Sequence, residues 1–307
     1  MAKYILKRVL HLILIMLGVT FITFALMHLA PSDPASVKLQ NGGVGITEEM
    51  IQKTRHEMGL DKPFLVQYFT WLTNVLHGDL GNSYVDGMPV ISKLGKAIPN
   101  TLILTAATMA LTLVVSIPLG VLTAVRKNKF TDYFIRFLTF VGSALPNFFL
   151  SIALIYIFAI RLKLMPVISD ISFKGLILPT VAMSVSWSAK FIRQIRAAVL
   201  EELNSRYVMG SRARGLSEWA ILMRHILKNT MITVLTLIGL AIGTILAGTA
   251  VIETIFNWRG VGKLVIDAIG SRDYPIVQGF VIWTSFVYVV VNLLTDLSYQ
   301  LIDPRVR

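Results

Sequence analysis

Long apolar stretches, each bounded by polar residues, recur along the sequence at lengths that suit a lipid bilayer. A helix needs about 20 apolar residues to cross the hydrocarbon core of a membrane. Six such stretches lie at about 9–30, 101–125, 137–160, 176–188, 232–252 and 279–302. The pattern therefore predicts an all-α polytopic membrane protein with about six transmembrane helices, or five if the short fourth stretch does not span.

The fourth stretch is short because basic residues follow it at helical spacing. Lys190, Arg193 and Arg196 continue the periodicity of 176–188 beyond the apolar residues. We expect a single helix there that leaves the membrane at its C-terminal end.

The first stretch has some features of a signal peptide, since it follows Lys3, Lys7 and Arg8. The apolar part of a signal peptide is about 7–15 residues long, whereas this stretch is about as long as a full span. Ala30-Pro31 is also a poor cleavage site. We interpret the stretch as a retained first transmembrane helix.

Composition agrees with a membrane location. Hydrophobic residues make up 55% of the 307 residues and charged residues only 15%, with a mean hydropathy of +0.69. Soluble domains carry about 25% charged residues, which cover their surface. This chain has too few charges for that, so its outer surface faces lipid.

The net charge of +12 has an uneven distribution that predicts the orientation. Segments 1–8, 126–136, 189–230 and 303–307 hold 17 of the 29 Lys and Arg residues but only five of the 17 acidic residues. Because Lys and Arg favour cytoplasmic loops, both termini are predicted to be cytoplasmic. The basic excess is thus a topology signal, and we expect no nucleic-acid partner.

The predicted outer segment 31–99 is too long for a simple connector. Thr47 is expected to cap one helix, with Glu48 and Glu49 in its first turn. A second helix is expected from Pro63 to Gly78. Its apolar stripe contains Phe64, Tyr68, Trp71, Leu72 and Val75. This stripe fits either the outer membrane interface or the protein's own outer surface.

Motifs for catalysis or metal binding are missing from the sequence. The five histidines show no ligand spacing, and there are no cysteines. Gly260-Val261-Gly262-Lys263 differs from a phosphate-binding loop, because Leu264 stands where Ser or Thr is required. We therefore expect a chain that is not an enzyme, does not hydrolyse ATP and binds no metal or cofactor.

Ionisable residues are sparse inside the predicted spans. Asp296 is the clear case, and it either pairs with a cation on a neighbouring helix or takes part in transport. An ion-coupled secondary transporter is the alternative function, but it would need more such residues or inverted repeats. Spans almost free of charge suit a transport subunit whose energy comes from elsewhere.

The basic segment between the fourth and fifth spans predicts a helix–turn–helix elbow. A helix that ends at Ala213 would be capped by Gly215, and Ser217 would cap the next helix. Such an elbow is well shaped to dock into a groove on another protein. A basic loop could also simply satisfy the orientation rule or contact anionic lipid.

The elbow resembles the coupling loop of type I ATP-binding-cassette import permeases, and above all their peptide/nickel group. The resemblance rests on Tyr207-Val208, on Ala213 to Ser217, and on Arg224-His225 with Lys228-Asn229. Where the wider family has Glu-Ala-Ala, this chain has Met209-Gly210-Ser211, which is usual for the peptide/nickel group.

Further motifs in the family's order extend the resemblance over nearly the whole chain. They are Ala30 to Pro34, Gly59 to Pro63 with Gln67-Tyr68, His77 to Gly81, Ala144 to Phe148, Glu253 to Phe256, Arg272 to Pro275 and Asp303 to Arg307. Arg259 stands where the family commonly has Pro, so the resemblance does not predict the local shape of that outer loop.

The resemblance implies an organisation and a set of partners. The chain would comprise the N-terminus and first span (1–30), the outer helical segment (31–99), a five-helix type I permease core (100–302) and a cytoplasmic tail (303–307). It would sit in a bacterial or archaeal plasma (inner) membrane. Its partners would be a homologous second permease, two ATP-binding subunits, an extracytoplasmic substrate-binding protein and membrane lipid.

The resemblance also implies site residues and a substrate class. The ATPase-coupling loop lies within 199–230, and its expected residues are Arg206, Tyr207, Arg212, Ala213, Arg214, Gly215, Leu216, Ser217 and Trp219. Of these, Arg206, Arg212 and Arg214 would offer charge pairs to the ATPase. Expected residues of the translocation path are Pro146, Asn147 and Asp296. The imported substrate would be a di- or oligopeptide, or nickel or another metal chelate.

Overall fold

The computed structural model describes residues 2–29, 33–41 and 47–302, and the side chains of 10–29, 33–40 and 47–295. All regular elements in this part of the chain are helices, apart from a single antiparallel bridge between Asn82 and Pro89. The C-terminal tail 303–307, the side chain of Asp296 and part of the motif from Ala30 to Pro34 lie outside the described residues.

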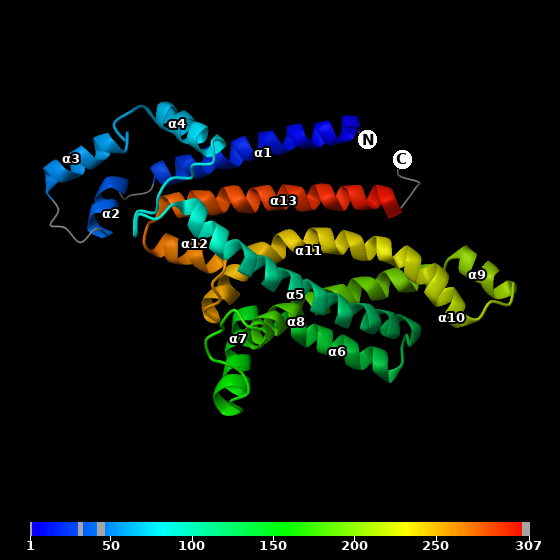
Figure 1. The fold of residues 1–307 in the computed structure, drawn as a ribbon. Coiled ribbons are helices and arrows are strands. Elements are labelled where there is room, and N and C mark those ends of the chain that lie inside the picture. The colour runs from blue at the N-terminus through cyan, green and yellow to red at the C-terminus, as the bar shows by residue number, and fades with distance from the viewer. Residues whose placement is uncertain (1, 30–32, 42–46, 303–307) are drawn as a thin grey trace. The chain divides into compact units, whose positions relative to one another are not determined.

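The chain forms two compact units, each built from segments distant in sequence. Figure 1 labels the helices that make them up. Unit 1 comprises 1–101 and 259–289, and unit 2 comprises 102–258 and 290–307. This division follows compactness. The predicted division into segments follows the sides of the membrane and stays a prediction.

Two long helices, α5 (Val90–Val125) and α13 (Tyr274–Ile302), run from one unit into the other. The other helices of unit 1 are α1 (Ala2–His28), α2 (Pro34–Asn41), α3 (Glu48–Glu57), α4 (Phe64–Leu76) and α12 (Val261–Gly270). The other helices of unit 2 are α6 (Phe130–Ala144), α7 (Asn147–Leu154), η1 (Ile155–Arg161), α8 (Phe173–Leu203), α9 (Arg206–Ala213), α10 (Glu218–Ile221), η2 (Leu222–Ile226) and α11 (Leu227–Ile255).

Five helical stretches within the described residues are long and apolar enough to cross a membrane. They are Leu10–His28, Val90–Val125, Phe173–Leu203, Glu218–Ile255 and Tyr274–Thr295. A sixth span exists if α6 and the α7–η1 helix count as one. The number agrees with the predicted range of five to six spans, but the reason for the lower number is different. The short fourth stretch lies in the long helix Phe173–Leu203, and the uncertain span is the third.

The third span is not the continuous helix predicted over 137–160. Helix α6 ends at Ala144, and the helix that starts at Asn147 is bent by 100° relative to it. The break falls at Leu145 and Pro146. Leu145 has extended backbone angles (φ −76°, ψ 125°), because the ring of a following proline disfavours the helical conformation.

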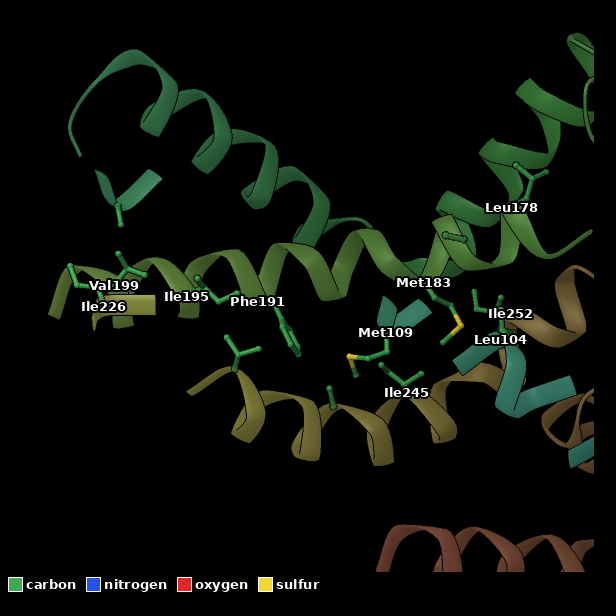
Figure 2. Packing of buried hydrophobic residues seen from close by; sticks show 14 of the residues in the cluster. Leu104, Met109, Leu178, Met183, Phe191, Ile195, Val199, Ile226, Ile245 and Ile252 are labelled. Carbon is green, nitrogen blue, oxygen red and sulfur yellow. The ribbon is translucent and has the colours of Figure 1, made fainter. Parts of the chain in front are cut away.

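Helix α8 lies at the centre of unit 2. It packs against α6, α7 and α11, and it continues through Lys190, Arg193 and Arg196 as predicted. Figure 2 shows Met109 of α5, Met183 of α8 and Ile245 of α11 pointing toward one another in the buried cluster. Inside a membrane such close packing, rather than the hydrophobic effect, holds helices together.

Glycine sets the approach of α5 to α8. A Cβ added at Gly120 would lie 2.7 Å from Cγ2 of Ile195 and 3.3 Å from the carbonyl oxygen of Ile192. Real Cβ atoms do not approach so closely, so a larger residue at position 120 would push the two helices apart.

In unit 1, aromatic rings join α1 to α4. Phe21 and Phe24 of α1 contact the rings of Phe64 and Tyr68, with centroids 5.2–5.8 Å apart. The hydroxyls of Tyr68 and Thr20 are 3.1 Å apart. The start at Pro63 and the stop at Gly78 agree with the prediction. These aromatic residues of the stripe therefore pack on the protein's own helix α1, and a position of α4 at the membrane interface stays a prediction.

Two sets of hydrogen bonds in unit 1 join residues 83–101 to residues 259–273. The carboxylate of Asp273 accepts bonds from the hydroxyl of Ser83 and, at 2.9 Å, from the backbone N–H of Tyr84. The Asn100 amide donates to the carbonyl of Arg259 at 2.7 Å. The backbone N–H of Val261 donates to the hydroxyl of Thr101 at 2.8 Å, beside Arg259. The loop that contains Arg259 is thus fixed by hydrogen bonds at Arg259 and at Val261.

Candidate functional site

The predicted site residues fall on three separate parts of unit 2. All nine elbow residues lie on α9, α10 and the turn between them. Pro146 and Asn147 lie at the break between α6 and α7. Asp296 is in α13, but its side chain is outside the described residues.

Helix α9 ends in a Schellman motif, in which a left-handed glycine closes the last turn. The N–H of Gly215 donates to the carbonyl of Arg212 (2.9 Å), and the N–H of Leu216 donates to that of Ser211 (3.2 Å). Gly215 has φ +79°, a conformation that only residues without a Cβ adopt at low cost. The predicted cap is therefore confirmed in its geometry.

Ser217 starts the second arm of the elbow, as its sequence position predicts. Its hydroxyl accepts a hydrogen bond from the N–H of Ala220 at 3.3 Å, which satisfies one of the free donors of a helix start. From Glu218 the chain is helical to Ile255, through α10, η2 and α11. The exposed turn is thus joined directly to a span.

Arg212 and Glu218 form an ion pair across the turn. The guanidinium donates through Nε to Oε1 at 2.7 Å and through Nη2 to Oε2 at 3.1 Å. Both side chains are exposed, so the pair orients the elbow more than it stabilises the fold. In the single chain the charge of Arg212 is thus paired within the elbow, and the predicted charge pair with an ATP-binding subunit stays a prediction.

A polar cluster ties α9 to the ends of α8 and α11. The Tyr207 hydroxyl donates to Glu202, and the amide of Asn229 donates to Glu202 at 3.1 Å and to Tyr207 at 3.3 Å. Burial, followed by the hydrogen bond to Glu202, raises the pKa of Tyr207 above its usual value. Sequence reasoning noted Tyr207 and Asn229 but missed Glu202, because no local pattern points to it.

The outer face of the elbow combines apolar and cationic groups. Trp219 is 69% exposed and Leu216 40% exposed, and Arg206 and Arg214 of the same elbow are also exposed. Next to this face lies a cavity of about 420 Å³, lined by residues that include Lys127 and Trp219. Exposed aromatic and arginine side chains of this kind dominate the energetics of protein interfaces.

At the break between α6 and α7, Asn147 links two helices. Its side-chain oxygen accepts a hydrogen bond from the Ser186 hydroxyl of α8 at 2.5 Å. Pro146 is exposed and Asn147 is half-buried. The geometry shows how the bend is held. The role of these residues in transport stays a prediction.

The burial of two acids, Asp132 and Glu253, was not predicted from the sequence. Asp132 of α6 is fully buried and accepts two hydrogen bonds from Arg196 of α8, at 3.0 and 2.8 Å. Glu253 is fully buried in α11, which extends beyond the predicted end of the fifth span at 252. Asp296 is therefore not the only acid inside a long apolar helix.

Comparison with known families and proteins gives consistent matches. A family described as "Binding-protein-dependent transport system inner membrane component" matches residues 116–307. The family of the corresponding N-terminal components matches residues 1–105.

Similar curated proteins cover almost the entire chain. A probable peptide ABC transporter permease of Sinorhizobium fredii is 40% identical over 100% of both chains. A probable D,D-dipeptide transport system permease of Escherichia coli is 35% identical over 98% of this chain and 96% of its own. A nickel import system permease of Staphylococcus aureus is 35% identical over 99% of this chain and 92% of its own.

Among solved structures, an inward-facing form of the MetNI methionine ABC transporter is similar in fold. Its matching chain has a TM-score of 0.58 and 14% identity, and the match covers 69% of this chain and 97% of that chain. At this identity the likeness concerns the fold alone. It agrees with the predicted type I permease core.

Proposed function

Since the chain belongs to the family of binding-protein-dependent transport system inner membrane components, and is thus a multi-pass inner-membrane permease subunit of an ABC importer, we propose that its elbow from Arg206 to Trp219 couples ATP hydrolysis to transport. The energy would come from separate ATP-binding subunits. In this proposal the elbow docks onto one of them and passes its motion to the spans.

The observation that carries this proposal is the continuity between the elbow and a span. Helix α10 is capped by Ser217, begins at Glu218 and continues without a break through η2 into α11. Displacement of an exposed, rigid turn would therefore tilt an entire transmembrane helix, as rigid-body switching requires. Leu216 and Trp219 would supply the apolar anchor, and Arg206 and Arg214 the charge pairs, while Arg212 would hold the elbow's shape.

The proposed assembly follows from this role. A second, homologous permease would complete the translocation path, with Pro146, Asn147 and Asp296 on it. Two ATP-binding subunits would bind on the cytoplasmic side, one elbow to each, and a substrate-binding protein would deliver cargo from outside. The chain itself would hydrolyse no ATP and bind no cofactor.

We propose a di- or oligopeptide, or a nickel chelate, as the cargo. The similar proteins from S. fredii and E. coli are described as peptide and dipeptide permeases, and the one from S. aureus as a nickel import permease. In a binding-protein-dependent system the external protein does most of the selecting. Mass spectrometry of the ligand that co-purifies with the substrate-binding protein would show which of the two cargoes is imported.

The purified chain is expected to show no ATPase activity, whereas the complex with its cognate ATP-binding subunits should hydrolyse ATP. Uptake into vesicles containing the complex should require ATP and the binding protein, and it should not respond to an ion gradient. ATP hydrolysis by the isolated chain would contradict the proposal. Uptake driven by an ion gradient without ATP would favour the alternative, a secondary transporter.

Both termini are expected on the cytoplasmic side, with the segment around Gly87 outside. The sequence contains no cysteine, so single cysteines placed after Arg307 and next to Gly87 can be labelled without background. An impermeant thiol reagent applied to intact cells should label only the cysteine near Gly87. If both sites react from the same side of the membrane, the orientation is wrong.

A further inference from the structure

A groove rich in arginine lies on the surface of unit 2, away from the elbow. It has a volume of about 560 Å³ and is formed by α6 and α8. Its lining residues are Tyr133, Arg136, Phe137, Thr139, Phe140, Arg193 and Arg196. The proposed coupling and the proposed translocation residues use none of these side chains.

The groove has a surplus of positive charge. Arg196 is paired with Asp132, but none of the described residues that line the groove is acidic. Arg193 donates from Nη1 to the Ser143 hydroxyl at 3.1 Å, and Arg136 lies 5.9 Å from the ring centre of Tyr133. These contacts are to neutral groups. The carboxylate of Asp132 pairs with Arg196 and also attracts Arg136, so three arginines share one carboxylate and the groove keeps an excess of positive charge.

The same groove has an apolar end. Tyr133, Phe137 and Phe140 are all more than half exposed, and they lie at helical spacing on α6. Phe140 falls within the predicted third span, whereas Arg136 and Arg193 fall in segments predicted to be cytoplasmic. The groove therefore crosses the boundary between the inner headgroup layer and the hydrocarbon.

We propose that this groove binds an anionic phospholipid of the inner leaflet. The phosphate would accept hydrogen bonds from Arg136 and Arg193, since a guanidinium fork matches phosphate oxygens. The acyl chains would run along Phe137 and Phe140. Basic pockets between membrane helices on the cytoplasmic side bind such headgroups.

A lipid fits these observations better than a soluble anion or an acidic protein segment. A soluble anion would leave the three exposed aromatic rings uncovered. An acidic segment would match the arginines but not the continuation of the groove into the hydrocarbon region. The inference needs only the membrane location and the predicted orientation, so it stands or falls independently of the coupling role of the elbow.

The test is a lipid titration of the purified, delipidated full-length chain in detergent, with the melting midpoint as readout. Phosphatidylglycerol should raise the midpoint in a saturable way, and phosphatidylcholine should not. In R136Q/R193Q we expect the half-saturating phosphatidylglycerol concentration to rise roughly 25-fold, since each interfacial cation contributes about fivefold. Arg196 is left unchanged because it holds Asp132.

The matched control is R126Q/K129Q, which removes the same charge from exposed residues that do not line the groove. It should bind phosphatidylglycerol within about twofold of the wild type. R136K/R193K keeps the positive charges but loses the planar guanidinium groups. Its half-saturating phosphatidylglycerol concentration should lie between those of R136Q/R193Q and R126Q/K129Q. All variants should melt at similar temperatures without lipid, because the replaced side chains are exposed.

Three outcomes would overturn the proposal. One is unchanged phosphatidylglycerol binding by R136Q/R193Q, and another is equal stabilisation by both lipids. The third is an equal loss in R126Q/K129Q, which would indicate a diffuse surface charge effect. Loss of co-purification with the second permease, combined with unchanged lipid binding, would assign the groove to a protein partner instead.

Discussion

Gly215→Val is expected to reduce ATP-driven uptake about tenfold while membrane abundance stays normal. A Cβ at this position would meet no atom within 4 Å, so the defect cannot come from a clash. It comes from φ +79°, which costs roughly 1–3 kcal/mol for a residue other than glycine, and most for a β-branched one. The Schellman turn would open, and Leu216 and Trp219 would be misaimed.

Gly210 offers a matched control within the same short helix. It also has no atom within 4 Å of an added Cβ, and its φ is not in the left-handed region. Gly210→Val should therefore transport like the wild type, and Gly215→Asn, which tolerates φ above zero, should keep most activity. Uptake and co-purification of the ATP-binding subunits are measured at equal membrane levels. Normal values for Gly215→Val would show that this turn is not the coupling element.

Asp132→Ala is expected to lower the free energy of unfolding by about 2–3 kcal/mol. The change leaves the guanidinium of Arg196 beside α6 without its partner, and breaking a buried pair typically costs about 3–5 kcal/mol. We expect a smaller loss than this range, because the Arg196 side chain is 20% exposed and water can still solvate part of its charge. Asp132 also accepts a hydrogen bond from the N–H of Asn128 at 3.0 Å, so the turn before α6 would loosen as well.

Unfolding of purified variants in detergent, followed by circular dichroism, measures this effect. Glu218→Gln is the control, because it breaks an ion pair of similar geometry that is exposed, and exposed pairs contribute little. We expect its unfolding curve to overlay that of the wild type. A shift for Glu218→Gln as large as for Asp132→Ala would mean that burial of the α6–α8 pair has no special effect.

Local features of the fold were predictable where one residue type imposes the geometry. Thr47 caps α3 by accepting from the N–H of Met50 at 3.3 Å, and Gly215 and Ser217 delimit the elbow as expected. In these cases donor, acceptor and backbone angle all lie within a few residues. All the residues that determine each of these helix ends therefore lie in one short stretch of sequence.

The bend at Pro146 could not be predicted in the same way. Pro179 lies inside α8, which continues as a helix over 31 residues, whereas Pro146 separates two helices bent by 100°. Membrane helices tolerate proline when neighbouring groups satisfy the backbone. The outcome at Pro146 depends on contacts such as that of Asn147 with Ser186, and those partners are remote in sequence.

The buried ion pair of unit 2 and the hydrogen bonds of Asp273 in unit 1 were also not predictable, because their partners are remote in sequence. Asp132 and Arg196 are 64 positions apart, and Ser83 and Asp273 are 190 apart. The charge pattern predicts that 126–136 and 189–230 are cytoplasmic, but it carries no information on which acid pairs with which arginine. Such pairs are fixed by helix packing, which a single sequence does not specify.

The discontinuity of unit 1 imposes an order on biosynthesis. Its first part, 1–101, leaves the ribosome before any residue of unit 2, and its second part, 259–289, follows only after Trp258. The loop at Ser83 and Tyr84 therefore lacks its hydrogen-bond acceptor, Asp273, until the helices of unit 2 up to Trp258 have been synthesised. We expect nascent chains arrested before residue 259 to expose this loop to proteases of the envelope, and chains released after the last helix to resist them.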